Sequence, residues 1–201
     1  YELITLVPKK FDMALRKFIT KVDNTDVTTR IPKVALDSNG KIVYVHPKDP
    51  VLTANSQIVT YTIRVFNEGE VDGYAAEVID DLPNGIQFLP DHETNKKYTW
   101  VMYDKDGNVT NDVLKADTIR TDYLSKEKSQ ERGEDALMRA YDPTKPISSD
   151  PNNPNPDYKD LQVAFVVTES NLNSDRIITN TARLTKMTDK DGNPTKNTDE
   201  N

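Results

Sequence analysis

Three predicted strands each carry one polar residue on a face that is otherwise apolar. Lys17 stands at alternate positions with Leu15 and Ile19, while Asp80 and Asn180 interrupt the apolar faces of a middle strand and of the last strand in the same way. Side chains alternate between the two faces of a strand, so residues two apart share a face. The spacing therefore predicts that an amine, a carboxylic acid and a carboxamide all point inward.

Together these three groups would form a bond. Burial lowers the pKa of a lysine and raises that of an aspartic acid, because it disfavours the charged forms. A neutral Lys17 amine would attack the Asn180 amide carbon, while a protonated Asp80 polarises the amide and carries the proton to the leaving ammonia. The product is a Lys17–Asn180 isopeptide bond, made once per molecule. The chain is therefore not predicted to be an enzyme with turnover.

Each residue also has a structural interpretation. Lys17 would lay its stem on the core and extend its ammonium to the sheet edge, Asn180 would satisfy a backbone group near a bulge, and Asp80 would cap the turn at residues 82–85. A slip of the strand register by one residue or by three would replace Asp80 with Asp81 or Glu77 as the assisting acid.

The elements that must position these groups are strands. Period-2 alternation dominates and long helical periodicity is scarce, apart from a charged, helix-like piece at residues 125–141. Many short strands separated by polar turns indicate an all-β sandwich. The predicted strands cover residues 10–22, 41–47, 57–67, 74–90, 97–109, 161–169 and 176–187.

We predict one domain over residues 10–187, interrupted by a long loop insertion at about residues 92–160 that ends in a run rich in Pro, Asn and Asp. Residues 1–9 are predicted to be an N-terminal linker or edge. Residues 188–201 contain few core-forming side chains and are predicted to be a C-terminal linker. The start at Tyr1, without a signal-peptide pattern, indicates a fragment of a longer protein.

Composition excludes several classes of function. The chain has 201 residues, a net charge of −7, no Cys and two His. The acidic balance argues against nucleic-acid binding, and no apolar run is long enough to cross a membrane. No disulfide, thiolate metal site or cofactor is expected, and the two DKDGN segments are predicted to be ordinary turns rather than calcium loops. A hydrolase is disfavoured, since the chain has no G-x-S-x-G motif or paired-His metal motif.

Four segments resemble a known family. They are residues 11–20, 59–70 (VTYTIRVFNEGE), 78–91 (VIDDLPNGIQFLPD) and 178–185. In this order they are similar to the immunoglobulin-like conserved-repeat domains of Gram-positive cell-surface proteins, including adhesin and pilin domains that form intramolecular isopeptide bonds. The resemblance implies an immunoglobulin-like sandwich with Lys17 and Asn180 as the cross-linked pair and Asp80 as the acid.

The leading functional hypothesis is a stalk or spacer domain of a secreted or cell-wall-attached bacterial protein, stiffened by the cross-link. Its partners would be neighbouring domains of the same protein. The second hypothesis is a ligand-binding adhesin module that uses the 92–160 insertion to bind a host protein or glycan.

Overall fold

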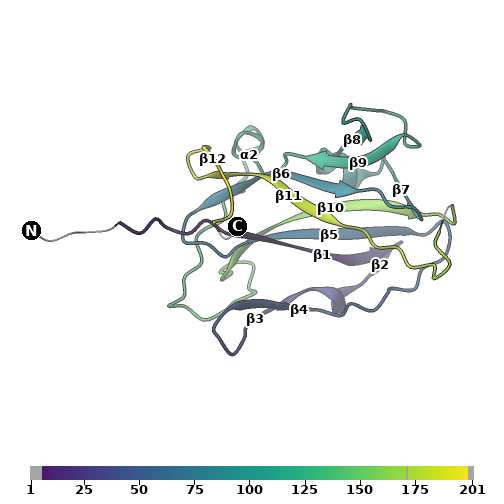
Figure 1. Cartoon of the computed structure of the whole chain (residues 1–201). Coiled ribbons are helices and arrows are strands. Elements are labelled where there is room, and N and C mark those ends of the chain that lie inside the picture. Colours follow the sequence, from purple (N-terminus) through teal and green to yellow (C-terminus); the bar gives the residue numbers. More distant parts are fainter. Residues whose placement is uncertain (1–5, 171, 199–201) are drawn as a thin grey trace, which may run out of the picture.

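The computed structural model describes residues 6–170 and 172–198, and they form an all-β sandwich, as the alternation predicts (Figure 1). The first sheet has the order β2-β1-β5-β10-β7 and the second the order β12-β11-β6-β9-β8, with every pair antiparallel. The strands of the first sheet are β1 (Met13–Val22), β2 (Thr25–Asp26), β5 (Ile58–Asn67), β7 (Ile86–Phe88) and β10 (Asp157–Val167). Those of the second are β6 (Gly73–Asp81), β8 (Val101–Asp104), β9 (Ala116–Thr121), β11 (Ala182–Asp189) and β12 (Pro194–Thr195).

A separate hairpin, β3 (Lys33–Leu36) and β4 (Ile42–Val45), follows a short 3-10 helix, Thr28–Arg30. Its Tyr44 ring lies 4.4 Å from the ring of Phe66 on β5 and stacks with the Arg16 guanidinium of β1 at 4.3 Å. The first sheet is thus covered on both faces near β5, which explains why the segment richest in β-branched and aromatic residues became its central strand.

Residues 92–160 differ from the loop insertion expected. They supply helix α1 (Glu93–Lys97), strands β8 and β9, helix α2 (Lys126–Arg132) and the beginning of β10. The segment supplies two strands of the second sheet, and its apolar side chains belong to the core of the domain. The buried members are Tyr98, Trp100, Met102, Ile119, Tyr123, Leu124, Ala136 and Met138.

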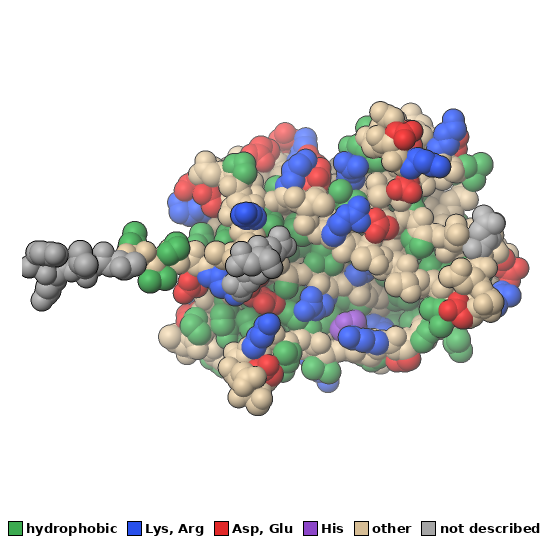
Figure 2. Space-filling view, in the orientation of Figure 1, with side chains coloured by type: hydrophobic (Ala, Val, Ile, Leu, Met, Phe, Trp, Pro, Cys, Tyr) green, Lys and Arg blue, Asp and Glu red, His purple; other side chains and the backbone are tan. Residues whose placement is uncertain are grey.

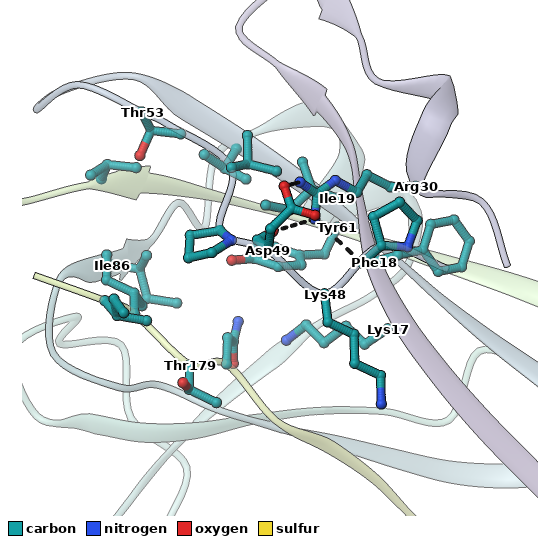
Figure 3. Close-up of a pocket in the computed structure, with 18 of the residues that line it drawn as sticks. Lys17, Phe18, Ile19, Arg30, Lys48, Asp49, Thr53, Tyr61, Ile86 and Thr179 are labelled. Atoms are coloured by element: carbon teal, nitrogen blue, oxygen red, sulfur yellow. Dashed lines mark hydrogen bonds and ion pairs between the residues drawn. The ribbon is translucent and has the colours of Figure 1, made fainter. Parts of the chain in front are cut away.

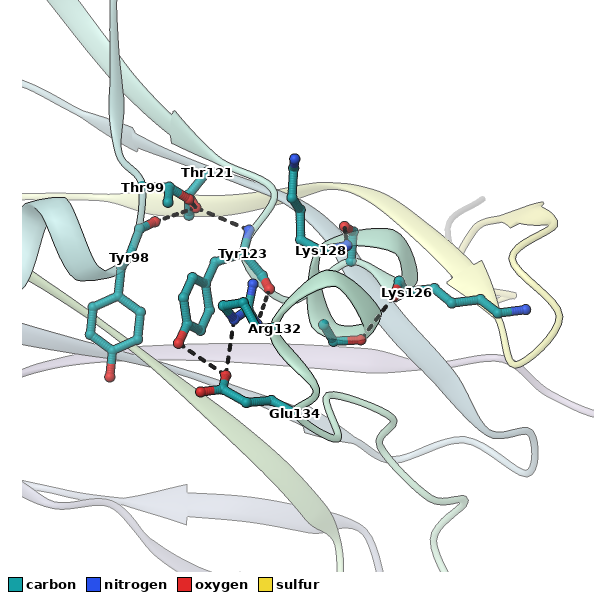
Figure 4. A network of polar contacts seen from close by, with 10 residues as sticks. Tyr98, Thr99, Thr121, Tyr123, Lys126, Lys128, Arg132 and Glu134 are labelled. Carbon is teal, nitrogen blue, oxygen red and sulfur yellow. Dashed lines mark hydrogen bonds and ion pairs between the residues drawn. The ribbon is translucent and has the colours of Figure 1, made fainter.

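A polar network fastens α2 to this part of the core (Figure 4). The Arg132 guanidinium stacks on the Tyr123 ring at 3.4 Å and donates to the Tyr123 carbonyl. Glu134 accepts hydrogen bonds from both side chains. Arginine on an aromatic face combines packing with charge, so the charged helix is docked by one side while its remaining charges face solvent.

Residues 188–198 also differ from the linker expected. β11 continues to Asp189, a turn follows, and β12 pairs back onto β11. Asn197 and Thr198 then hydrogen-bond to the backbone of Met13 and Phe11. This end of the chain is therefore part of the domain.

On the face seen in Figure 2, Lys and Arg side chains alternate with Asp and Glu. No broad field of one sign is visible on that face.

Candidate functional site

Lys17 and Asp80 meet between the two sheets. Lys17 lies in the middle of β1, opposite Ile63 of β5, and Asp80 lies near the end of β6. The Lys17 Nζ is 2.5 Å from Asp80 Oδ1 and 2.6 Å from Oδ2. The Lys17 side chain is only 7% exposed and that of Asp80 is fully buried. Lys17 therefore does not extend to solvent, and Asp80 points into the core rather than capping the turn after β6.

Aromatic rings complete the surroundings of the amine. The Nζ lies 4.7 Å from the centre of the Tyr61 ring and 5.7 Å from that of Phe165. Both rings come from strands of the first sheet, β5 and β10, and they exclude water from one side of the pair. Ring faces stabilise a cation, but by less free energy than the cation loses when its hydration is removed.

The pKa values of the pair move toward each other. Burial lowers the pKa of Lys17 from 10.5 to about 8, against the raising effect of the Asp80 charge. Burial likewise raises the pKa of Asp80 from 3.8 to about 6, against the lowering effect of Lys17. Desolvation is the larger cause in both residues, so burial makes the neutral forms that the reaction needs more accessible than they are in water.

Both shifts lower the free-energy cost of moving the proton from the Lys17 ammonium to the Asp80 carboxylate, because burial disfavours both charged forms. Burial thus helps to prepare the nucleophile and its acid partner together.

Asn180 stands at the edge of the same site. It lies two residues before Ala182, which pairs with Asp80, and the Asp81 N–H donates to the carbonyl of Thr181. Exposure alternates from Ile178 to Leu184 with the even-numbered residues turned inward, as predicted. The regular strand begins only at Ala182, later than predicted, because β6 ends at Asp81 and offers no further backbone to pair with.

Ile178, two residues earlier, seats this segment against the turn after β6. Gly85 has φ +92, and a Cβ there would lie 2.7 Å from Ile178. The turn thus requires glycine twice, for its backbone angle and for this close approach. The Ile178 contact before Asn180 and the Thr181 hydrogen bond after it together fix the position of Asn180.

The side-chain amide of Asn180 is buried without a hydrogen-bond partner. Neither its Oδ1 nor its Nδ2 has one among the residues that the structure describes. Asn67 and Asn95, by contrast, use both amide atoms on backbone groups of neighbouring loops and strands. An unpaired buried amide costs about 1–3 kcal/mol, so the fold tolerates at Asn180 a cost that it avoids at the others.

A cavity of about 370 Å³ connects the two residues (Figure 3). Lys17 and Asn180 both line it, with apolar walls from Ile19, Ile86 and Ile178 and a rim formed by the 46–51 loop. In the close-up Lys17 points into this space, opposite Thr179. The cavity is large enough to let a molecule the size of ammonia leave.

The two alternative acids point away from Lys17. Asp81 pairs with Arg183 at 2.5 Å. Glu77 accepts from Thr185 and pairs with Lys186 at 2.9 Å. The register observed therefore brings Asp80, not Asp81 or Glu77, against the amine.

The histidines, Trp100 and the acidic residues of the two DKDGN segments make contacts that are typical of structural residues. His46 lines the rim of the cavity, His92 caps α1 by accepting from the Thr94 N–H, and Trp100 is buried with its Nε1 donating to Gln162. Asp104 and Asp189, which begin the two DKDGN segments, accept hydrogen bonds from backbone N–H groups of their own turns. The described part of the chain holds no cluster of His, Asp or Glu that could bind a metal ion.

Within residues 6–170 and 172–198, no helix has both the length and the apolar character needed to cross a membrane. The comparisons with known proteins supply no relative: no family model, no curated protein and no solved structure matches the chain.

Proposed function

We propose that this domain is a structural module, a stalk or spacer of a bacterial surface protein, stabilised by an autocatalytic isopeptide bond between Lys17 and Asn180. One observation carries the proposal: a buried amine and carboxylic acid lie in contact, and a buried carboxamide without a partner lines the same cavity.

The reaction begins with the proton that Lys17 and Asp80 share. In the neutral pair the Lys17 nitrogen has a free lone pair and Asp80 carries the proton. Asp80 donates a hydrogen bond to the Asn180 Oδ1, which makes the Cγ more electrophilic, and the Lys17 Nζ adds to that carbon.

The tetrahedral intermediate then loses ammonia. Asp80 takes a proton from the former amine and delivers a proton to Nδ2, so that the Cγ–Nδ2 bond breaks and the Cγ–Nζ bond remains. One amine and one carboxamide become one secondary amide and one ammonia, and Asp80 ends as it began. The packed strands hold the reacting groups together, which replaces a slow encounter in solution.

The product benefits a domain that must stay folded while exposed. A cross-link that closes a 100-residue loop contributes about 4.7 kcal/mol in the chain-entropy model, and a longer loop adds only logarithmically. The bond would join β1 to the segment before β11, which belong to different sheets and share no strand pairing. It would also do so without Cys, which the chain lacks.

This role fits a secreted or cell-wall-attached location, with neighbouring domains of the same protein as partners. Such a domain would need neither a cofactor nor a ligand.

Intact-mass measurement tests the proposal. The folded chain should be one ammonia lighter than its sequence mass, and Lys17→Ala and Asn180→Ala should each retain the full mass. Asp80→Asn should slow the mass loss by about 10²–10⁴-fold, the usual contribution of a general acid–base group.

Glu77→Gln and Asp81→Asn are the matched controls, because both remove a nearby carboxylate that does not touch Lys17. Each should still lose ammonia to completion. A wild-type chain that is folded and has its full mass would refute the cross-link, and with it the proposed role.

A further inference from the structure

The start of the folded domain, at Phe11, and the end of the described chain, at Thr198, lie together at one pole of the domain (Figure 1). The Phe11 N–H donates to Thr198 Oγ1 at 2.7 Å, and the Thr198 N–H donates to the Phe11 carbonyl at 2.9 Å. Next to them the Asn197 side chain accepts from the Met13 N–H at 2.8 Å and donates to the Met13 carbonyl at 3.0 Å. We call these four residues, Phe11, Met13, Asn197 and Thr198, the latch.

The latch joins the two sheets. Phe11 and Met13 lead into and begin β1 of the first sheet, whereas Asn197 and Thr198 follow β12 of the second. The Asn197 amide offers Met13 the same donor and acceptor that a neighbouring strand would, so a side chain replaces backbone pairing. The Phe11 and Met13 side chains beneath these hydrogen bonds are buried, but the latch opens without breaking a covalent bond, whereas the cross-link cannot.

Chain direction decides how force would act on it. β1 runs away from this pole, and β11 runs back toward it, because β11 is antiparallel to β6 and β6 starts beside the Phe11 end. A load applied to the two ends therefore enters and leaves at one pole and separates the latch bonds one after another.

We infer that the latch and the Lys17–Asn180 cross-link act in series, as a weak first restraint and a permanent second one. This inference rests on the proposed function. Load first opens the latch, then separates β12 from β11, β11 from β6 and residues 13–16 of β1 from β5, and extension stops at the cross-link. Residues 18–179 then carry no load and stay folded.

The maximum extension of the chain differs greatly with and without the cross-link. Six residue steps separate Phe11 from Lys17 and 18 separate Asn180 from Thr198, so a cross-linked chain can lengthen by at most about 80 Å, at 3.3–3.6 Å per residue. Without the bond, the 187 steps from Phe11 to Thr198 can extend by about 640 Å.

Single-molecule pulling on the full chain, held through handle domains at both ends, tests this. Wild type whose mass confirms the bond should show one low-force lengthening no greater than about 80 Å and then no further unfolding of this domain. Asn197→Ala should lower the force of that step without changing the final length. Asn193→Ala is the control, since its side-chain amide donates to Asp189 of its own turn and is not one of the latch residues, and it should leave the step unchanged.

Two results would overturn the inference: a cross-linked wild type that lengthens well beyond 80 Å, or a first step that Asn197→Ala does not weaken. Amide hydrogen exchange keeps the latch testable if no bond forms. Asn197→Ala should then speed exchange at the Met13 N–H by about tenfold, as expected for the loss of one hydrogen bond. Unchanged exchange there would refute the latch, whereas a full-mass wild type refutes the proposed function.

Discussion

Asn67 and Asn180 both have buried side-chain amides, but the two amides differ in their hydrogen bonding. The Asn67 amide donates to the carbonyls of Val71 and Met138 and accepts from the Gly69 N–H, so it fastens the β5–β6 turn to a distant segment. The Asn180 amide makes no such bond to any residue in the described part of the chain, and it lies at a cavity that Lys17 also lines. A satisfied buried amide contributes to structure, whereas an unsatisfied one beside a buried amine and acid is available for chemistry.

The largest expected effect comes from removing the reactive amide. Asn180→Ala should lower the free energy of unfolding by about 5 kcal/mol, the chain-entropy value for a loop of this size. Chemical denaturation of wild type and variant, each checked by intact mass, measures it. A variant as stable as wild type would mean that the two regions do not differ in the way proposed.

Lys17 and Asp80 should then show that they depend on each other. Lys17→Met leaves the Asp80 carboxyl buried without its partner, at a cost of about 3–5 kcal/mol. The double variant Lys17→Met, Asp80→Leu removes both groups and should recover most of that loss. Both should be compared with Asn180→Ala, which also lacks the bond but retains the pair. Equal stability of the single and double variants would contradict a buried, coupled pair.

Asn67→Ala probes the other side of the comparison. It leaves the Val71 carbonyl and the Gly69 N–H without their Asn67 partner, while the Met138 carbonyl still accepts from the Gly73 N–H. The loss should cost roughly 3 kcal/mol, because each unsatisfied buried group is destabilising. The folded variant should still lose one ammonia, since Asn67 takes no part in the reaction. Denaturation and intact mass together separate it from Asn180→Ala.

The pH dependence of bond formation is a finer test. The reactive pair, neutral Lys17 with protonated Asp80, holds as many protons as the ion pair. Its population is therefore constant between the pKa of Asp80 at about 6 and that of Lys17 at about 8.

Below pH 6 Asp80 gains a proton while Lys17 stays charged, and above pH 8 Lys17 loses its proton while Asp80 stays ionised. The rate should fall about tenfold per pH unit on each side. Dilution of denatured chain into buffers of different pH, followed by mass, gives the profile. A rate that rises steadily to pH 10 would mean that Asp80 is not needed as an acid.

The sandwich could be predicted because alternation along β1, β5 and β6 is a local property. The same alternation was sufficient to predict that the Lys17, Asp80 and Asn180 side chains point inward. Strand β9, by contrast, was missed, because its sequence ADTIRT mixes polar and apolar residues without a clear period. Its Ile119 is completely buried only because β6 and β8 flank it.

The 92–160 segment and the C-terminal tail were also predicted incorrectly, because local sequence patterns do not report contacts between distant segments. Helices α1 and α2 are short and the strands between them are interrupted by turns, so local composition resembles a surface insertion. Asn197 and Thr198 are polar residues in a polar tail, and only the nearby backbone of β1 gives them a structural role.

The sequence by itself determined the all-β class and the inward direction of three chemically matched side chains, because strand periodicity follows from backbone geometry. Only the tertiary structure decided that the Lys17 amine contacts Asp80 rather than Asp81 or Glu77, that the Asn180 amide finds no hydrogen-bond partner within residues 6–170 and 172–198, and that both ends of the domain share one pole. Those outcomes depend on strand register and on how two sheets pack, which no single segment specifies.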